Sequence, residues 1–364
     1  MFGLDLPLAS PPVPPGASLA QLTTFRMGGP PGTLVDCTST EQLVSAVQKA
    51  DAAGQRLLVL GGGSNLVAGE ELGELVVVRN RCSAVVAQQT GARIQLTVQA
   101  GASWDALVAW TVERGWSTLA PLSGIPGSVG AAPVQNIGAY GSEVAAALTG
   151  VQAWDRERGQ LVDLGLEDLE LGYRDSVLKR SMVGAAGQRA SGSVSPRWVV
   201  LEVTLELDQQ SSEVKYSQLA QALGCSLGAL APASEIRQAV LQIRRAKGMV
   251  LESEDHDTWS AGSFFTNPVL SQTQDRNLDP DAPRFPAPGG VKTSAAWLIQ
   301  QTGVQRGWGV RPGARATTST KHVLALTNRG GATVSDVLEL AEQITLRVQR
   351  RFGITLVPEP TLVN

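Results

Sequence analysis

Cysteine and histidine are scarce in this chain, which has three cysteines and two histidines among 364 residues. Cys37, Cys82 and Cys225 are scattered, with no CxxC spacing and no partner histidines. Structural zinc sites need clusters of such ligands, and disulfide-stabilised secreted domains need a framework of paired cysteines. The sequence therefore argues against a metal site and favours a reducing compartment, which we expect to be the cytoplasm.

A strong charge of either sign and a long apolar run are also missing. The formal net charge is −3 at pH 7, and no basic face is visible that would neutralise phosphates in number. No apolar run approaches membrane-spanning length, and no basic segment followed by an apolar core opens the chain. We therefore expect no nucleic-acid partner, no membrane span and no signal peptide. A few placed cations would meet any anionic substrate.

Apolar residues, by contrast, are plentiful and recur in short periodic runs. They make up 43% of the sequence, enough for a large core in two or three domains. Their spacing predicts an α+β fold with short strands. The predicted strands are Leu57–Leu60, Leu75–Val78, Ile94–Val98, a Val151–Leu164 hairpin, Trp198–Leu207 and a closing strand, Ile354–Val357. The predicted helices are one from a Ser39–Gln42 capping box to Gly54, then Ser103–Gly115, Ser234–Lys247, Thr293–Thr302 and Val334–Phe352.

Two segments have the composition of loops outside this pattern. The Pro-rich lead Pro11–Pro15 predicts a mobile, extended arm. The stretch Gly184–Ser195 is small and polar, which predicts a surface loop.

The segment Pro121–Glu143 is so rich in glycine and proline that it cannot form an ordinary helix or strand. Pro126 and Gly127 suit the middle of a type II turn. Exposed backbone N–H groups in such loops bind anions such as a pyrophosphate. This segment therefore predicts a main-chain binding surface.

A second glycine-rich loop, Gly61–Asn65, follows the apolar run Leu57–Leu60, the placement expected of a phosphate or cofactor cradle. It lacks the lysine of a P-loop and the glycine spacing of a dinucleotide-binding fingerprint. By itself the motif is equally compatible with a simple tight turn.

Several short motifs, taken together in order, resemble one enzyme family. They are TFRMGG at Thr24–Gly29, GGGSN at Gly61–Asn65, IPGSVGAAPVQNIGAYG at Ile125–Gly141, YRDS at Tyr173–Ser176, RRAK at Arg244–Lys247, AGSFFTNP at Ala261–Pro268, AAWLI at Ala295–Ile299 and PE at Pro358-Glu359. This set is similar to that of the UDP-N-acetylenolpyruvoylglucosamine reductases, flavoenzymes that make UDP-N-acetylmuramate for bacterial peptidoglycan. The Ala-Pro-Val-Gln-Asn run and Tyr216 resemble the type I branch, whose tyrosine loop folds over the substrate.

The resemblance implies a fold and a set of ligands. Residues 24–208 would form a FAD-binding PCMH-type (vanillyl-alcohol-oxidase-like) domain after an N-terminal arm at 1–23, and residues 209–364 a C-terminal α+β substrate-binding domain with the tyrosine loop. FAD would bind non-covalently, NADPH would be the reductant, and the substrate would be an enolpyruvyl ether of a UDP sugar. We expect the protein to be a monomer.

The resemblance also assigns binding residues. The FAD contacts would be Gly61, Gly62, Gly63, Ser64, Asn65, Leu66, Ser123, Ile125, Pro126, Gly127, Gly130, Gln135, Asn136, Gly138, Ala139 and Tyr140. The substrate contacts would be Tyr173, Tyr216, Lys247, Asn267 and His322.

Three residues would carry the chemistry by this resemblance. Hydride addition to the enol double bond leaves negative charge that spreads into the substrate carboxylate. Arg174 could hold that carboxylate through two parallel hydrogen bonds. Glu359 would act opposite it as a protonated or proton-sharing partner, which requires a raised pKa or a tightly paired arginine. Ser263 would deliver the proton to the second carbon.

Each catalytic assignment competes with an ordinary structural role. Arg174 could form a surface pair with Asp175. Ser263 could be a loop or cap serine, and Glu359 a solvated residue near the C-terminus.

The substrate assignments and the function itself also have alternatives. Lys247 could compensate a helix C-terminus, and His322 could be structural. Thr361 follows Pro360 where the family usually has an arginine, and residues 181–196 form a longer region than usual. A flavin oxidase of the same fold and a non-catalytic nucleotide-sugar sensor are the alternative functions.

Overall fold

The computed structural model describes residues 2–4, 10–91, 93–182, 194–208 and 211–364. Most of the predicted loop Gly184–Ser195 lies outside these residues. The chain divides into two units. The first holds Met1–Ala17, Pro31–Gly63 and Leu72–Arg245, and the second holds Ser18–Pro30, Ser64–Glu71 and Ala246–Asn364. The functional boundary that we placed after residue 208 stays a prediction.

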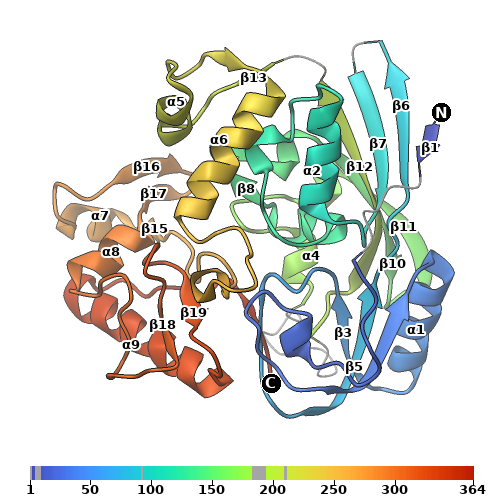
Figure 1. Ribbon diagram of the computed structural model, residues 1–364, viewed down its shortest axis with the longest axis horizontal. Coiled ribbons are helices and arrows are strands. Elements are labelled where there is room, and N and C mark those ends of the chain that lie inside the picture. The colour runs from blue at the N-terminus through green and yellow to red at the C-terminus, as the bar shows by residue number, and fades with distance from the viewer. Residues whose placement is uncertain (1, 5–9, 92, 183–193, 209–210) are drawn as a thin grey trace. The chain divides into compact units, whose positions relative to one another are not determined.

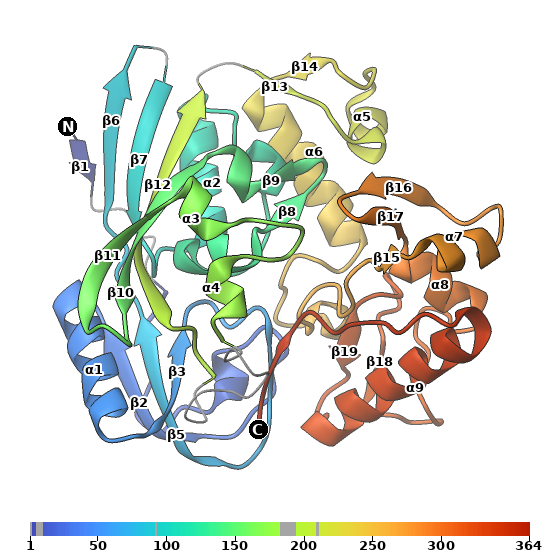
Figure 2. The same cartoon turned by 180° about the vertical axis from the view of Figure 1, so that it is seen from behind.

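The larger sheet of the first unit is antiparallel, with strand order β1-β6-β7-β12-β10-β11 (Figures 1 and 2). Its strands are β1 (Phe2–Leu4), β6 (Val85–Thr90), β7 (Arg93–Gln99), β12 (Trp198–Asp208), β10 (Leu148–Asp155) and β11 (Gln160–Gly165). Along β7 and most of β12, buried and less buried residues alternate, as they do in a sheet with one buried face. The predicted hairpin is confirmed, because β10 pairs with β11 across the turn at 156–159.

A second sheet in this unit is parallel, with order β2-β5-β3. Its strands are β2 (Pro31–Cys37), β5 (Leu72–Asn80) and β3 (Arg56–Leu60), and α1 (Thr40–Ala52) connects β2 to β3 and packs on the sheet (Figure 1). The central strand β5 is buried along most of its length, as expected of a strand covered on both faces.

The predicted capping box of α1 forms only in part. Ser39 caps the helix by accepting a hydrogen bond from the Gln42 amide at 3.3 Å. The Gln42 side chain, however, accepts from the amide of Thr38 at 3.0 Å instead of that of Ser39. The cap residue was thus predicted correctly and the return bond was not.

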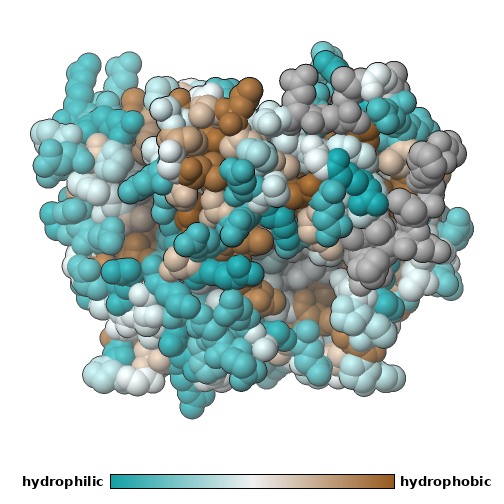
Figure 3. Space-filling model, turned by 45° about the horizontal axis from the view of Figure 1, so that its top comes forward, coloured by the Kyte–Doolittle hydropathy of each residue, from teal (hydrophilic) through white to brown (hydrophobic). Residues whose placement is uncertain are grey.

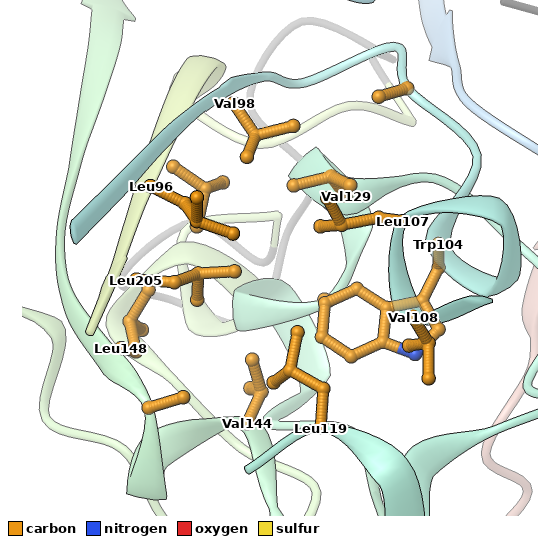
Figure 4. Close-up of a cluster of buried hydrophobic side chains, with 14 of the residues drawn as sticks. Leu96, Val98, Trp104, Leu107, Val108, Leu119, Val129, Val144, Leu148 and Leu205 are labelled. Carbon is orange, nitrogen blue, oxygen red and sulfur yellow. The ribbon is translucent and has the colours of Figure 1, made fainter. Parts of the chain in front are cut away.

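The main core of the first unit lies between the antiparallel sheet and α2 (Trp104–Glu113) (Figure 4). Leu96 and Val98 of β7 and Leu205 of β12 meet Trp104 and Leu107 of the helix, and all five are buried. The other elements of the unit are β8 (Gly138–Ala139), β9 (Ser142–Glu143), β13 (Ser212–Glu213), β14 (Leu230–Ala231), α3 (Leu166–Leu169), α4 (Val177–Arg180), α5 (Ser217–Leu223) and α6 (Ala233–Ala246).

The second unit builds its core around a long amphipathic helix, α9. Thr333 and Asp336 form a capping box at its start, Gly353 ends it with a left-handed φ of 66°, and its apolar stripe is buried. The elements of this unit are β4 (Leu66–Ala68), β15 (Val269–Leu270), β16 (Arg284–Ala287), β17 (Gly290–Thr293), β18 (Ala316–Thr318), β19 (Leu326–Asn328), β20 (Thr361–Val363), α7 (Gln272–Asn277), α8 (Ala295–Gln301) and α9 (Val334–Phe352).

Two predicted boundaries in the second unit are wrong. Thr293 ends β17 and does not begin a helix, which starts at Ala295. Ile354–Val357 forms no strand. Ile354 and Leu356 are buried and their neighbours are exposed, so the sequence alternates as a strand does although no hydrogen-bonded strand partner is present in the described chain. The closing strand is β20, which pairs in parallel with β4.

The sequence predicted that the Pro-rich lead is a mobile arm, but the structure shows it hydrogen-bonded to the first unit. Arg79 donates to the carbonyl oxygen of Pro11 and Arg81 to that of Ser10, both at 2.9 Å, and Ala17 is buried. The two arginines lie far along the chain, so composition could not reveal them as partners.

The outer surface carries scattered apolar side chains. Figure 3 shows one face on which hydrophilic side chains predominate and hydrophobic ones form smaller groups. Among the described residues, no helix combines the length and apolar character needed to cross a membrane. The three cysteines are free thiols.

Replacing Leu96 by alanine should reduce the free energy of unfolding by about 2–5 kcal/mol, because it leaves a cavity in the main core of the first unit. The matched control Leu161→Ala, in β11 with 54% of the residue exposed, should change it by less than about 0.5 kcal/mol. Urea denaturation followed by circular dichroism measures both. Equal effects of the two substitutions would contradict the assigned burial.

Candidate functional site

The two glycine-rich loops lie against each other in the first unit. A Cβ atom added to Gly62 would lie 2.6 Å from Cα of Gly127, and one added to Gly61 would lie 2.2 Å from Oγ of Ser128. Gly127 has a φ of 128°, which L side chains rarely adopt. The junction of the loops is therefore formed by backbone and has no room for further side chains.

The amides at this junction are available to a ligand. Within the described residues, the N–H groups of Gly62 and Gly63 donate to no protein acceptor, although Gly63 is buried. Buried amides are nearly always paired, so an exception calls for a partner from outside the chain. Successive unpaired amides beside a turn suit an anion such as a pyrophosphate.

The second glycine-rich segment is irregular, as predicted. Short 3₁₀ turns at Val129–Ala131 and Pro133–Gln135 lead into the two-residue strand β8. Asn136 and Tyr140 have left-handed φ values of 42° and 52°, which for residues other than glycine persist only where the surroundings impose them.

Asn136 is held by the fold. Its Nδ2 donates to Glu143 at 2.9 Å and to the carbonyl of Gly172 at 3.0 Å, and its Oδ1 accepts from the Ala145 amide at 3.2 Å. Both side-chain donors are thus occupied. Gln135 and Asn136 are both predicted polar FAD contacts. The hydrogen bonds of Asn136 serve mainly to fix the loop.

Arg174 is attached to the same segment. Its guanidinium donates to the carbonyls of Asn136 at 3.2 Å and Gly138 at 2.6 Å, and its own φ is 54°. Asp175, the ordinary alternative partner, forms its ion pair with Arg180. The predicted catalytic arginine is therefore positioned by the predicted cofactor loop.

Aromatic residues flank the end of this segment. Tyr140 and Tyr216 stack edge to face with ring centroids 5.7 Å apart, and Tyr216 is 41% exposed. Burial raises the pKa of the Tyr140 hydroxyl, against the opposing charge and hydrogen bond of Arg244. Tyr173 is exposed beside the guanidinium of Arg174, 5.3 Å from its ring centroid. These three tyrosines, from the predicted cofactor and substrate sets, belong to one unit.

Asp105 is a site residue that sequence reasoning missed. Its carboxylate accepts from the Gly124 amide at 2.6 Å and from Arg237 at 2.6 and 3.0 Å. Burial would raise the pKa of Asp105, but these hydrogen bonds and the charges of Arg237 and Arg244 outweigh it and lower the pKa. The only sequence signal was an acidic residue in the first turn of a helix, which usually needs no further explanation.

The predicted proton donor and its predicted partner lie on neighbouring segments of the second unit. The Glu359 amide donates to the carbonyl of Phe264 at 2.8 Å, and Phe265 forms a β-bridge with Pro358. Ser263 precedes these two buried phenylalanines, and no residue of the described chain hydrogen-bonds to its hydroxyl. Glu359 is partly buried and not a solvated residue.

Asn65 joins the first glycine-rich loop to this arrangement. Its Nδ2 donates to the Glu359 carbonyl at 3.3 Å, and its own carbonyl accepts from the Thr361 amide at 2.9 Å. Thr361 opens β20. The predicted FAD contacts Ser64, Asn65 and Leu66 thus share a unit with Ser263 and Glu359, whereas Arg174 belongs to the other unit.

A cationic group lies around His322 in the second unit. Burial, followed by the charges of Lys247 and Arg306, lowers the pKa of His322 to about 4. Its Nδ1 accepts from the Leu324 amide at 3.1 Å, so the neutral ring carries its proton on Nε2. Two cations near a neutral imidazole suit a diphosphate. Arg306 was not predicted from the sequence.

Asn267 has a structural role as well as its predicted one. Its Oδ1 accepts from the Ala295 amide at 3.0 Å, beside the Ser294 cap of α8. Trp297 packs against the core and Phe352. Among the described residues, no group of three or more potential ligands could hold a metal ion.

Comparison with known proteins gives matches along nearly the whole chain. Residues 31–165 match a FAD binding domain, and residues 252–363 match the C-terminal domain of UDP-N-acetylenolpyruvoylglucosamine reductase. The reductase of that name from Saccharopolyspora erythraea is 47% identical over 363 residues, covering 96% of this chain and 95% of the relative. The one from Nocardia farcinica is 46% identical over 357 residues, covering 95% and 88%. The crystal structure of the Thermus caldophilus enzyme matches with a TM-score of 0.61 at 26% identity, covering 96% and 98%.

FAD fits the residues of the first unit. A side chain at Gly61 or Gly62 would collide with the second loop, so only glycine lets the two backbones meet there. The amides of Gly62 and Gly63, which have no acceptor in the described chain, suit the cofactor's pyrophosphate. The FAD-binding fold predicted from the sequence is confirmed by the match over residues 31–165. Which residues touch the cofactor stays a prediction.

Replacing Gly62 by alanine should lower the affinity for FAD at least about tenfold, because the new methyl group would collide with the Gly127 backbone and separate the loops. Gly73→Ala is the matched control, since a Cβ at Gly73 meets nothing within 4 Å. Flavin bound per chain after gel filtration measures the effect. Full flavin content in Gly62→Ala would contradict the proposed cradle.

His322 should make the protein lose stability in acid. Because its pKa falls from an ordinary 6.5 to about 4 on folding, the unfolded chain takes up the proton first, and stability declines as pH falls from 6.5 toward 4. His322→Gln removes this contribution, so its stability should depend less on pH across that window. Urea denaturation at pH 7.5 and 5 tests this, and identical pH dependence in both proteins would refute it.

Proposed function

Because this chain belongs to the UDP-N-acetylenolpyruvoylglucosamine reductase family, we propose roles for its residues in that reaction. The protein is a FAD-dependent oxidoreductase of peptidoglycan precursor synthesis that acts on a UDP sugar. The resemblance found in the sequence motifs is thereby confirmed, and the alternatives of an oxidase and a sensor are not supported. A cytoplasmic, monomeric state stays a prediction.

FAD, when bound, supplies the hydride that it receives from NADPH. Two tasks remain: to stabilise negative charge on the enolpyruvyl group and to add a proton to it. Both tasks fall to side chains of this chain.

Arg174 would stabilise the charge that spreads into the substrate carboxylate. Its guanidinium is aligned by the carbonyls of Asn136 and Gly138, so little reorganisation is needed when the charge develops. Its left-handed backbone supports a functional role, because such strain concentrates at active sites.

Ser263 would deliver the proton, and this assignment rests mainly on its hydroxyl having no hydrogen-bond partner in the described chain. Phe264, beside it, is almost fully buried, so the serine borders an apolar region. Glu359, fixed on the adjacent segment by Phe264 and Asn65, would share a proton with the developing enolate.

The cationic group around His322 would bind the substrate diphosphate. Lys247 and Arg306 supply charge, and the neutral imidazole supplies one N–H donor. Tyr216 would close over the substrate, because its exposed ring can leave Tyr140 without disturbing a core.

Replacing Ser263 by alanine should impair only the second of the two half-reactions. NADPH should still bleach the flavin at the wild-type rate, whereas product formation from the enolpyruvyl UDP sugar should fall by about 10²–10⁴-fold, the range for losing a general acid. Stopped-flow absorbance follows the flavin, and product analysis follows the substrate. The exposed Ser335→Ala is the control, and an unimpaired second half-reaction in Ser263→Ala would end the proton-donor assignment.

A further inference from the structure

Arg26 belongs to the TFRMGG motif, yet the roles above do not use it. Its Nε is buried without a hydrogen-bond partner, and no acid of the described chain forms an ion pair with it. Other partly buried arginines form ion pairs with acids: Arg237 with Asp105 at 2.6 Å and Arg329 with Asp257 at 2.8 Å. Arg26 is therefore a partly buried cation whose partner does not come from the described protein.

The backbone of Arg26 is held in an uncommon conformation. Its φ is 55°, in the left-handed region that few residues other than glycine adopt. The amide donates to Thr23 at 3.2 Å, and the carbonyl accepts from the buried Asn328 side chain at 3.0 Å. Hydrogen bonds of both its amide and its carbonyl fix this strained geometry, and such strain concentrates at functional sites.

The neighbouring residue ties this turn to the predicted site. The Thr24 hydroxyl donates to the carbonyl of Ser260 at 2.7 Å and to that of Ser64 at 3.4 Å. Ser64 belongs to the first glycine-rich loop, and Ser260 leads to Ser263. Arg26 thus lies two residues from the bonds that join these two segments of the second unit.

We propose that Arg26 binds a phosphate group of a bound nucleotide, supplied either by the pyrophosphate of FAD or by the diphosphate of the UDP sugar. The buried Nε–H of Arg26 has no acceptor in the described chain, which is unfavourable unless a ligand supplies one. The planar guanidinium fork matches two phosphate oxygens. The inference depends on binding of FAD and the UDP sugar, but not on the roles of Arg174, Ser263 and Glu359.

Arg26→Gln should weaken binding of one of these two ligands by about 10–100-fold, the range for a hydrogen bond to a charged group. FAD affinity is measured by fluorescence quenching on flavin-stripped full-length protein, and UDP affinity by calorimetry on the FAD-loaded protein. Loss confined to FAD assigns the arginine to the cofactor, and loss confined to UDP assigns it to the substrate. Arg26→Lys should recover part of the affinity, and the exposed Arg276→Gln should change neither.

The melting temperature without ligand separates binding from a structural role. Removing an unpaired, partly buried charge should leave the melting temperature of flavin-stripped Arg26→Gln unchanged or higher than wild type. The increase in melting temperature on adding the affected ligand should be smaller than in wild type.

Two results would overturn the inference. One is a lower melting temperature of the flavin-stripped variant, which would mean that Arg26 stabilises the fold itself. The other is that both affinities match those of Arg276→Gln. Failure of the proposed function would look different, because a misassigned Ser263 would leave the second half-reaction of Ser263→Ala unimpaired and would not alter the effect of Arg26→Gln on either affinity.

Discussion

The contact between the two glycine-rich loops is the constraint on which the cofactor part of the site depends. Gly62 approaches Gly127 so closely that a methyl group on Gly62 has no room. The two loops meet through their backbones, and the amides of Gly62 and Gly63 have no acceptor in the part of the chain that the structure describes. Residues of the second loop, such as Val129 and Ala132, pack into the core that the antiparallel sheet and α2 form around Leu96.

Carbonyl groups of the second loop also position Arg174, the residue proposed to hold the substrate carboxylate. Asn136 and Gly138 accept from Arg174, so the loop that would support the flavin also orients the arginine expected to hold the substrate carboxylate. Asp105 acts at the other end by holding the Gly124 amide. A shift of this loop would therefore move the cofactor and the charge-stabilising residue together.

The second unit contributes a different kind of order. Asn65, Phe264 and Glu359 are joined through backbone carbonyls and amides, so their positions depend little on side-chain rotamers. In contrast, the Ser263 hydroxyl and the Arg26 guanidinium have no partners in the described chain. A framework fixed through its backbone, with a few unsatisfied side chains, is typical of a site that is completed by its ligands.

The sequence by itself determined the features that depend on neighbouring residues. The apolar stripe of α9, the β10–β11 hairpin and the Ser39 cap were predictable because helix periodicity, alternation and capping are local, and the ordered motifs were sufficient to indicate the family. Only the tertiary structure decided that β20 pairs with β4, that Asp105 holds Gly124, and that the Nε of Arg26 has no partner among the described residues. These depend on which distant residues meet, and that is set by packing of the whole chain, not by local propensity.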